Sequence, residues 1–186
     1  MKGIVFTEFL DMVEENFGIE IVDYIINESK LQSEGIYTSV GTYDFVEMQS
    51  LLVNLSKKVE IPLDDLIYSY GLYFFRVLTT LHPAIFALYK DPIELVSSIE
   101  NHIHVQVRKL YPGAELPTFK VEKKTEDHLE ILYFSDRAMY MFAKALMEKT
   151  FEHYDRDSEI KMEKLAEDGT QVRFLITKKH GAYQKN

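Results

Sequence analysis

The sequence has no cysteine, and this absence removes several kinds of chemistry from its 186 residues. Without thiols the chain can form neither a disulfide nor a thiolate metal site, and it cannot use a cysteine nucleophile. Long apolar runs are also missing, since no segment approaches the roughly 18 apolar residues that a membrane span needs. The first residues, Met1 to Phe6, reach the acidic Glu8 too soon to form the apolar core of a signal peptide. These absences predict a soluble, cytoplasmic protein.

Positive charge is in short supply. The chain has 21 Lys and Arg against 30 Asp and Glu, which gives a net charge of −9. No basic stripe is present that could neutralise phosphates, which argues against nucleic acid as a partner. The same charge disfavours contact with an anionic membrane surface. The hydrophobic fraction of 46%, by contrast, is sufficient to bury a sizeable core at this length.

Signatures of catalysis are absent as well. The sequence contains neither a Gly-rich phosphate loop nor a G-x-S-x-G elbow. Its 6 histidines are scattered, and none of them form the i, i+4 pair of a helical zinc site. The two nearest, His102 and His104, point about 200° apart around a helix. We therefore expect a protein that is not an enzyme.

The first two-thirds of the chain has apolar residues at steps of three and four, which is typical of helices. Helices are predicted over residues 2–17, 20–29, 44–58 and 63–80. A short apolar piece follows over 84–89, and a further helix starts after Asp91 and ends at Pro112-Gly113. After Pro117 the apolar residues alternate, which predicts strands over 119–123, 129–133, 160–164 and 172–176, with a helix inserted over 137–153. The predicted fold class is α+β, a helical half followed by an antiparallel sheet of about four strands. The last residues, from Gly181, are expected to be frayed.

The helix after Asp91 carries a histidine in an unusual position. On a helical wheel His104 lies beside the apolar stripe of this helix, one step from Ile103, whereas His102 falls on the polar side. A histidine at the edge of an apolar groove is either a core residue with its hydrogen bonds satisfied or a ligand for a molecule bound in that groove. The helix alone favours the first interpretation, because lone histidines are usually structural.

A second short segment is more specific, Tyr133-Phe134-Ser135-Asp136-Arg137. In an extended strand the residues i, i+2 and i+4 line one face, so Tyr133, Ser135 and Arg137 would project together. Three hydrogen-bond donors, one of them a forked and permanently charged guanidinium, suit a grip on the carboxylates of a bound molecule. The alternative is the polar outer face of an edge strand with a serine that caps the next helix.

With both segments present, the chain resembles the haem-nitric oxide/oxygen-binding (H-NOX) domains, which are related to the sensor domain of soluble guanylate cyclase. The resemblance covers nearly the whole chain and rests on Met1-Lys2-Gly3, Phe17-Gly18, His104-Val105-Gln106-Val107, Pro117 and the Y-x-S-x-R pattern of Tyr133, Ser135 and Arg137. It implies one domain over residues 1–186, with an N-terminal helical subdomain over 1–62, a haem-ligating subdomain over 63–186 and the haem buried between them.

The resemblance also implies roles for individual residues. The position of His104 corresponds to the axial ligand of one b-type haem per chain, and Tyr133, Ser135 and Arg137 correspond to the residues that bind the two propionates. Val5 and Pro117 correspond to residues that pack against the haem. A neutral imidazole is a good iron ligand, and Arg137 can hold a carboxylate in a bidentate pair.

The family resemblance extends to the gas-binding side of the haem. Members that hold oxygen carry a distal tyrosine with supporting Asn and Trp, because dioxygen takes up negative charge on binding and needs a donor. The matching positions here are Phe142, Phe74 and Phe9, all without a donor. Tyr140 and Tyr73 lie near them in sequence but are expected to face elsewhere on their helices. We therefore expect ferrous five-coordinate haem that binds NO and CO and excludes O₂.

The resemblance implies signalling through the bond from iron to His104, which NO weakens. Related stand-alone bacterial proteins act on a sensor histidine kinase or a cyclic-di-GMP enzyme, and one of these is the expected partner. Two other functions stay open from the sequence. One is a haem carrier or haem redox sensor without gas signalling, and the other is a haem-free interaction module whose helical half simply packs aromatic residues.

Overall fold

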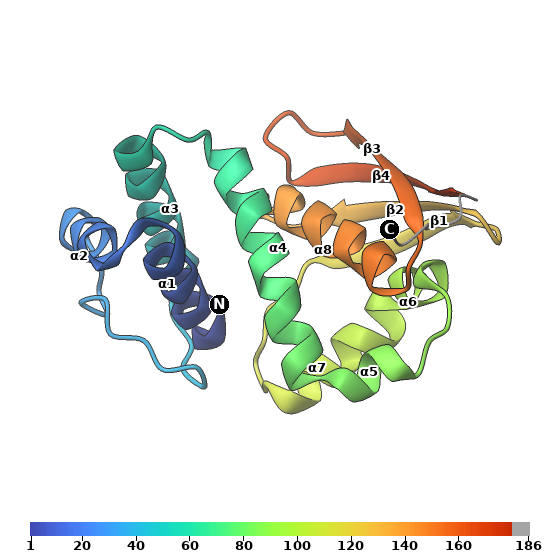
Figure 1. Ribbon diagram of the computed structural model, residues 1–186, viewed down its shortest axis with the longest axis horizontal. Coiled ribbons are helices and arrows are strands. Elements are labelled where there is room, and N and C mark those ends of the chain that lie inside the picture. Colours follow the sequence, from blue (N-terminus) through green and yellow to red (C-terminus); the bar gives the residue numbers. More distant parts are fainter. Residues whose placement is uncertain (180–186) are drawn as a thin grey trace, which may run out of the picture.

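The computed structural model describes residues 1–179, and its α+β architecture confirms the predicted fold class (Figure 1). Residues 181–186, predicted to be frayed, lie outside the described part. The helical elements that precede the sheet are α1 (Gly3–Phe17), α2 (Ile19–Glu28), α3 (Phe45–Val59), α4 (Leu63–Leu81), α5 (Pro83–Ala87), α6 (Pro92–Ser97), η1 (Ile99–Ile103) and α7 (His104–Leu110). In residues 1–179 no helix is long and apolar enough to cross a membrane.

Two helix starts follow from capping side chains. The carboxylate of Asp44 accepts a hydrogen bond from the Val46 N–H at 3.1 Å, which fixes the start of α3. Asp91 accepts from the Ile93 N–H at 2.8 Å, and Pro92 occupies the first helical position of α6. Each cap satisfies a backbone donor that the first helical turn leaves without a partner.

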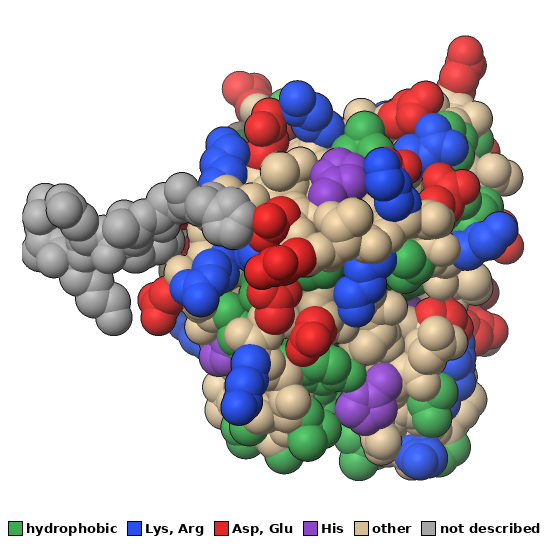
Figure 2. Space-filling model, turned by 90° about the vertical axis from the view of Figure 1, so that its right-hand side faces the viewer, with side chains coloured by type: hydrophobic (Ala, Val, Ile, Leu, Met, Phe, Trp, Pro, Cys, Tyr) green, Lys and Arg blue, Asp and Glu red, His purple; other side chains and the backbone are tan. Residues whose placement is uncertain are grey.

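The sheet consists of β1 (Thr118–Lys124), β2 (His128–Phe134), β3 (Asp157–Lys164) and β4 (Gln171–Lys179). Its strand order is β1-β2-β4-β3, and all neighbours are antiparallel. The chain between β2 and β3 forms α8 (Tyr140–His153), which lies between the sheet and α4 (Figure 1). On the face seen in Figure 2, the described acidic and basic side chains are interspersed, and no continuous basic patch gathers among them.

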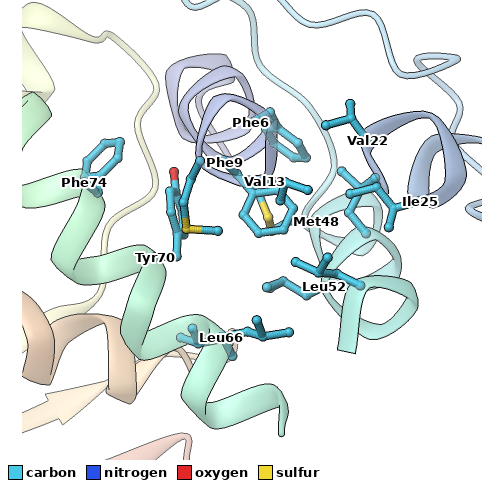
Figure 3. Packing of buried hydrophobic residues seen from close by; sticks show 14 of the residues in the cluster. Phe6, Phe9, Val13, Val22, Ile25, Met48, Leu52, Leu66, Tyr70 and Phe74 are labelled. Atoms are coloured by element: carbon cyan, nitrogen blue, oxygen red, sulfur yellow. The ribbon is translucent and has the colours of Figure 1, made fainter. Parts of the chain in front are cut away.

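Buried side chains form two clusters. The first joins α1, α2 and α3 to one face of α4, and Figure 3 shows Phe9 and Val13 of α1 packed between Met48 of α3 and Tyr70 of α4. The second lies between the sheet and the inner faces of α6 and α8. Because α4 contributes to the first cluster and also packs along α8, it joins the helical half to the sheet half. The predicted subdomain boundary at residue 62 falls just before this shared helix and stays a prediction.

The helix around His104 differs from the predicted continuous one. It ends at Ser97, and a π-helical turn over Ile99–Ile103 precedes α7. The carbonyl of Ser98 accepts hydrogen bonds from the N–H groups of both His102, at 2.8 Å, and Ile103, at 3.3 Å. A π turn inserts an extra residue and rotates everything after it, so the α-helical wheel used to place these side chains does not apply here. Such turns are rare and concentrate at functional sites.

Helices α4 and α8 cross at a glycine. A Cβ atom built on Gly71 would lie 2.6 Å from the Cβ of Ala145 and 2.8 Å from the carbonyl oxygen of Phe142. Because the second of these atoms belongs to the backbone, α8 itself would have to move to make room. Gly71 thus sets the distance between the helix that joins the two cores and the helix that carries Phe142.

We expect Gly71→Ala to lower the free energy of unfolding by about 1–2 kcal/mol. Overpacking of a buried contact costs roughly 1–3 kcal/mol, and a contact with backbone at 2.8 Å belongs to the upper half of that range. The helix propensity of alanine offsets about 1 kcal/mol of this cost. Urea unfolding followed by circular dichroism measures the change, with Ser69→Ala, on the exposed side of α4, as the matched control. Unchanged or increased stability of Gly71→Ala would show that the crossing tolerates a wider spacing.

Candidate functional site

A largely apolar cavity of about 300 Å³ lies where the N-terminus, α4, the segment around His104 and α8 meet. Its walls come from elements far apart in the sequence and include Val5, Phe74, Leu78, Pro117, Phe142 and Leu146. This volume is at the lower end of the range of roughly 300–1,000 Å³ for small-molecule sites. Several apolar residues of α4 beyond Phe74, among them Val77 and Leu78, line this cavity.

His104 is the first residue of α7 and lines the cavity wall, with only 8% of its surface exposed. Its Nδ1 lies 3.3 Å from Oε2 of Glu100, and its ring lies 5.7 Å from that of Phe119. Within residues 1–179 its Nε2 has no hydrogen-bond partner. Burial lowers the pKa of His104 below its ordinary value, although the carboxylate of Glu100 opposes this effect. The imidazole is therefore neutral at pH 7, the form that can bind a metal.

Glu100 has three partners. Besides His104, its carboxylate accepts a hydrogen bond from the backbone N–H of Phe119 at 3.0 Å and lies 3.4 Å from the Arg108 guanidinium. Burial raises the pKa of this carboxyl, but the Phe119 N–H and the neighbouring His104 and Arg108 outweigh it and hold the pKa below the usual value. Sequence analysis did not single out Glu100. Its i, i+4 spacing from His104 was the available signal.

His102 is directed elsewhere, as the sequence predicted. Its Nδ1 contacts the hydroxyl of Tyr89, which in turn accepts a hydrogen bond from the Ser98 hydroxyl at 2.7 Å. His102 is not among the residues that line the cavity. Of the two neighbouring histidines, His104 is therefore the one available to a ligand inside.

Tyr133, Ser135 and Arg137 all line the same cavity, but not because they share a strand face. Strand β2 ends at Phe134, and the chain then turns, with the Ala138 N–H donating to the Ser135 carbonyl at 3.1 Å. The predicted helix start at 137 is wrong for the same reason, since Ala138 has a φ of 50° and α8 begins at Tyr140. The three side chains thus line one cavity, as the i, i+2, i+4 spacing predicted, but a turn rather than a strand face brings them together.

The Arg137 guanidinium already holds a carboxylate. Its Nη1 donates to the backbone carbonyl of Glu115 at 2.8 Å, and its Nη2 pairs with the carboxylate of the same residue. The Arg137 side chain is largely covered, whereas that of Glu115 is exposed. Arg137 is therefore oriented toward an anion at the edge of the cavity, and an exposed, exchangeable side chain supplies that anion here.

Among the three phenylalanines predicted on the gas-binding side, two line the cavity. The rings of Phe74 and Phe142 lie 5.5 Å apart on its wall. Phe9 is fully buried in the first core and does not line the cavity itself, so its place on the gas-binding side stays a prediction. Its position on α1 places it one layer behind, with its ring 5.3 Å from that of Tyr70.

Hydroxyl groups near these rings are occupied. Tyr140 donates to Asp64 at 2.5 Å and Tyr73 to Glu15 at 3.3 Å, and neither tyrosine lines the cavity, as the sequence predicted. Tyr70, which sequence analysis did not single out, packs its ring 5.2 Å from Phe142 and donates its hydroxyl to the Val5 carbonyl at 2.6 Å. The cavity wall beside Phe142 is thus apolar.

These features suit a flat apolar molecule with carboxylates at one edge. The walls are aliphatic and aromatic, a neutral imidazole stands in one of them, and Tyr133, Ser135 and Arg137 add polar groups to the lining. Haem has this distribution of chemical groups, so the side chains fit it.

Comparisons with known proteins agree with the site. Residues 2–162 match the family model described as haem-NO-binding. The structure is similar to an Fe(II) unliganded H-NOX protein from K. algicida, with 56% identity, a TM-score of 0.97 and coverage of 98% of this chain and 99% of that chain. It is also similar to the H-NOX from Shewanella woodyi, solved with IWP-051 in the Fe(II)CO state, with 38% identity, a TM-score of 0.81 and coverage of 100% and 99%.

A third similar structure is an H-NOX protein from S. oneidensis in the Fe(II)NO state. It has 23% identity, a TM-score of 0.88 and coverage of 97% of this chain and 100% of that chain, and at this identity it supports the fold alone. No curated protein sequence matches the chain.

The burial of His104 predicts a pH dependence of stability in the haem-free protein. Its pKa is lowered on folding, so below about pH 6.5 the unfolded chain binds a proton that the folded chain does not. Stability is therefore fully present above that pH and falls as the pH drops toward the lowered pKa. We expect the urea midpoint to decrease less between pH 7.5 and pH 5.5 in His104→Gln than in the unsubstituted protein. An equal decrease in both proteins would show that the pKa of His104 is the same in the folded and the unfolded chain.

Proposed function

We propose that this chain, which belongs to the haem-NO-binding (H-NOX) family, is a nitric oxide sensor that carries one haem b, binds NO and CO and excludes O₂. The family consists of haem-binding gas-sensor domains. The observation that carries the proposal is the cavity that places His104 in an apolar wall and Arg137 at its edge. Bound haem supplies the ferrous iron at which a diatomic gas binds.

The residues of this chain have separate tasks in holding the haem. His104 is the proposed axial ligand through Nε2, since Glu100 occupies Nδ1. Arg137, with Tyr133 and Ser135, is proposed to bind the propionates, and Glu115 then gives up its place on the guanidinium. Val5 and Pro117 line the cavity and are proposed to pack against the macrocycle.

The walls of the cavity determine which gas is accepted. Dioxygen needs a hydrogen-bond donor beside it because it takes up negative charge on binding, whereas NO and CO need a donor far less. Of the cavity-lining residues on α4 and α8, only Thr150 carries a hydroxyl, and this group donates to the Leu146 carbonyl of its own helix at 2.8 Å. The rings of Phe74 and Phe142 offer no donor. The S. woodyi relative, 38% identical, was solved in a CO-ligated state, which supports gas binding by this fold.

The signal is proposed to leave through His104. Its helix α7 follows the π turn, and Glu100 connects the imidazole to β1 through the Phe119 N–H. With haem bound, His104 would attach this unit to the iron, and a gas that weakens this attachment would bias the position of the unit. The expected recipient is a sensor histidine kinase or a cyclic-di-GMP enzyme, and both this partner and the cytoplasmic location stay predictions.

Arg137→Gln tests the propionate grip. A charge-assisted hydrogen bond contributes about 1.5–3 kcal/mol, and part of this is offset because Arg137 must exchange Glu115 for the propionate. We therefore expect haem affinity to fall by about tenfold, measured as the rate of haem transfer to apomyoglobin. Arg76→Gln, an exposed cation on α4, is the matched control. Equal transfer rates in both variants would contradict the assignment, and rapid transfer from the unsubstituted protein would favour a haem carrier.

Absorption spectra test the gas selectivity. We expect the reduced protein to form stable complexes with NO and CO and none with O₂ in air, because the wall around Phe142 has no donor. Phe142→Tyr is expected to introduce that donor and stabilise an oxygen complex, whereas Phe142→Leu, which changes the wall without adding a hydroxyl, should not. A stable oxygen complex of the unsubstituted protein would overturn the proposed selectivity. A protein that stays colourless with added haemin would favour a haem-free interaction module.

A further inference from the structure

The carboxylate of Glu100 joins three separate parts of the structure. One oxygen, Oε2, lies 3.3 Å from Nδ1 of His104 and 3.0 Å from the backbone nitrogen of Phe119, and the other, Oε1, lies 3.4 Å from the Arg108 guanidinium. A plain surface ion pair would need only Arg108. The Phe119 N–H holds Oε2 at one place, so the carboxylate meets the imidazole from a position fixed by β1 rather than by its own flexible side chain.

The local backbone makes this arrangement possible. Glu100 lies in the π-helical turn and His104 is the first residue after it, so the two side chains are separated by one turn. The Tyr89 hydroxyl contacts His102 and accepts a hydrogen bond from Ser98, which anchors the opposite side of the same turn. The π turn is thus attached on both sides, with Glu100 and His104 toward the cavity and β1.

Resting on the axial role proposed for His104, we propose that Glu100 is a positioning residue. Its carboxylate accepts a hydrogen bond from the Nδ1–H of His104 and strengthens the bond between Nε2 and the haem iron. The hydrogen bond selects the tautomer whose Nε2 carries the lone pair, and it orients the ring. A carboxylate acceptor also raises the electron density of the imidazole, which makes it a stronger ligand. The residue therefore opposes the release of His104 and sets how much weakening NO must cause before the bond breaks.

Two consequences have definite signs. A stronger imidazole donor favours the ferric state, so loss of the carboxylate is expected to raise the haem midpoint potential. A stronger bond to His104 also favours the six-coordinate nitrosyl, so loss of the carboxylate is expected to shift the NO complex toward the five-coordinate form. Neither effect follows if Glu100 only joins α7 to β1.

The first experiment compares Glu100→Gln with Glu94→Gln, which removes an exposed carboxylate from the neighbouring helix α6. Resonance Raman spectra of the ferrous, unliganded proteins report the iron–histidine stretching frequency, which a purely structural role would not move. We expect this frequency to decrease in Glu100→Gln and to stay unchanged in Glu94→Gln. An unchanged frequency in a haem-loaded Glu100→Gln protein overturns the proposal.

A second experiment keeps Glu100 in place, so it does not depend on how Glu100→Gln folds. In His104→Gly, free imidazole can replace the missing side chain and donate an N–H to Glu100, whereas 1-methylimidazole cannot. We expect imidazole to bind more tightly and give the higher iron–ligand frequency, with 4-methylimidazole, which has a methyl group but keeps the N–H, as the size control. Equal behaviour of imidazole and 1-methylimidazole overturns the role of Glu100. Failure of the axial assignment looks different, since His104→Gly would then keep the unsubstituted spectrum without any added ligand.

Discussion

A neutral imidazole buried in an apolar wall is the constraint on which the rest of this structure depends. A polar group placed there loses its hydration and must find a partner inside the protein. Glu100 supplies that partner for Nδ1, and it does so only because the π turn and the first residues of β1 hold its carboxylate in reach. The other nitrogen is left to face the cavity. Glu100, the π turn and β1 thus combine to leave one nitrogen of His104 free to bind a ligand.

The cavity itself exists because the two cores share one helix without merging. Leu66 and Tyr70 of α4 are buried in the core of α1 to α3. Val77 and Leu78, further along, pack against the same core and also line the cavity. The spacing between α4 and α8 is set at Gly71, where a single methyl group would meet backbone. The chain therefore keeps an apolar space beside helices that pack closely at Gly71.

Element types were predictable from the sequence because apolar spacing reports them directly, and the predicted strands over 119–123 and 129–133 correspond to β1 and β2. The predictions failed where the backbone geometry depends on a single inserted or unusual residue. Apolar residues recur at steps of three and four on both sides of the π turn, so a continuous helix was expected there. The turn after Phe134 depends on the left-handed conformation of Ala138, which composition does not signal. Contacts between distant segments, such as Glu100 with Phe119, have no periodic trace at all.

Which residues line a pocket is the hardest feature to predict from the sequence, because a residue that lines a cavity and one that packs behind it are both apolar. Phe9 and Phe142 are both apolar and both near Tyr70, yet only Phe142 faces the cavity. The layer behind still matters chemically. On the face of α4 that carries Phe74, the nearest hydroxyl in sequence is that of Tyr70. It donates a hydrogen bond of 2.6 Å to the Val5 carbonyl. The apolar character of the proposed gas site therefore depends on that carbonyl as well as on the phenylalanine rings, because the carbonyl occupies the hydroxyl group of Tyr70.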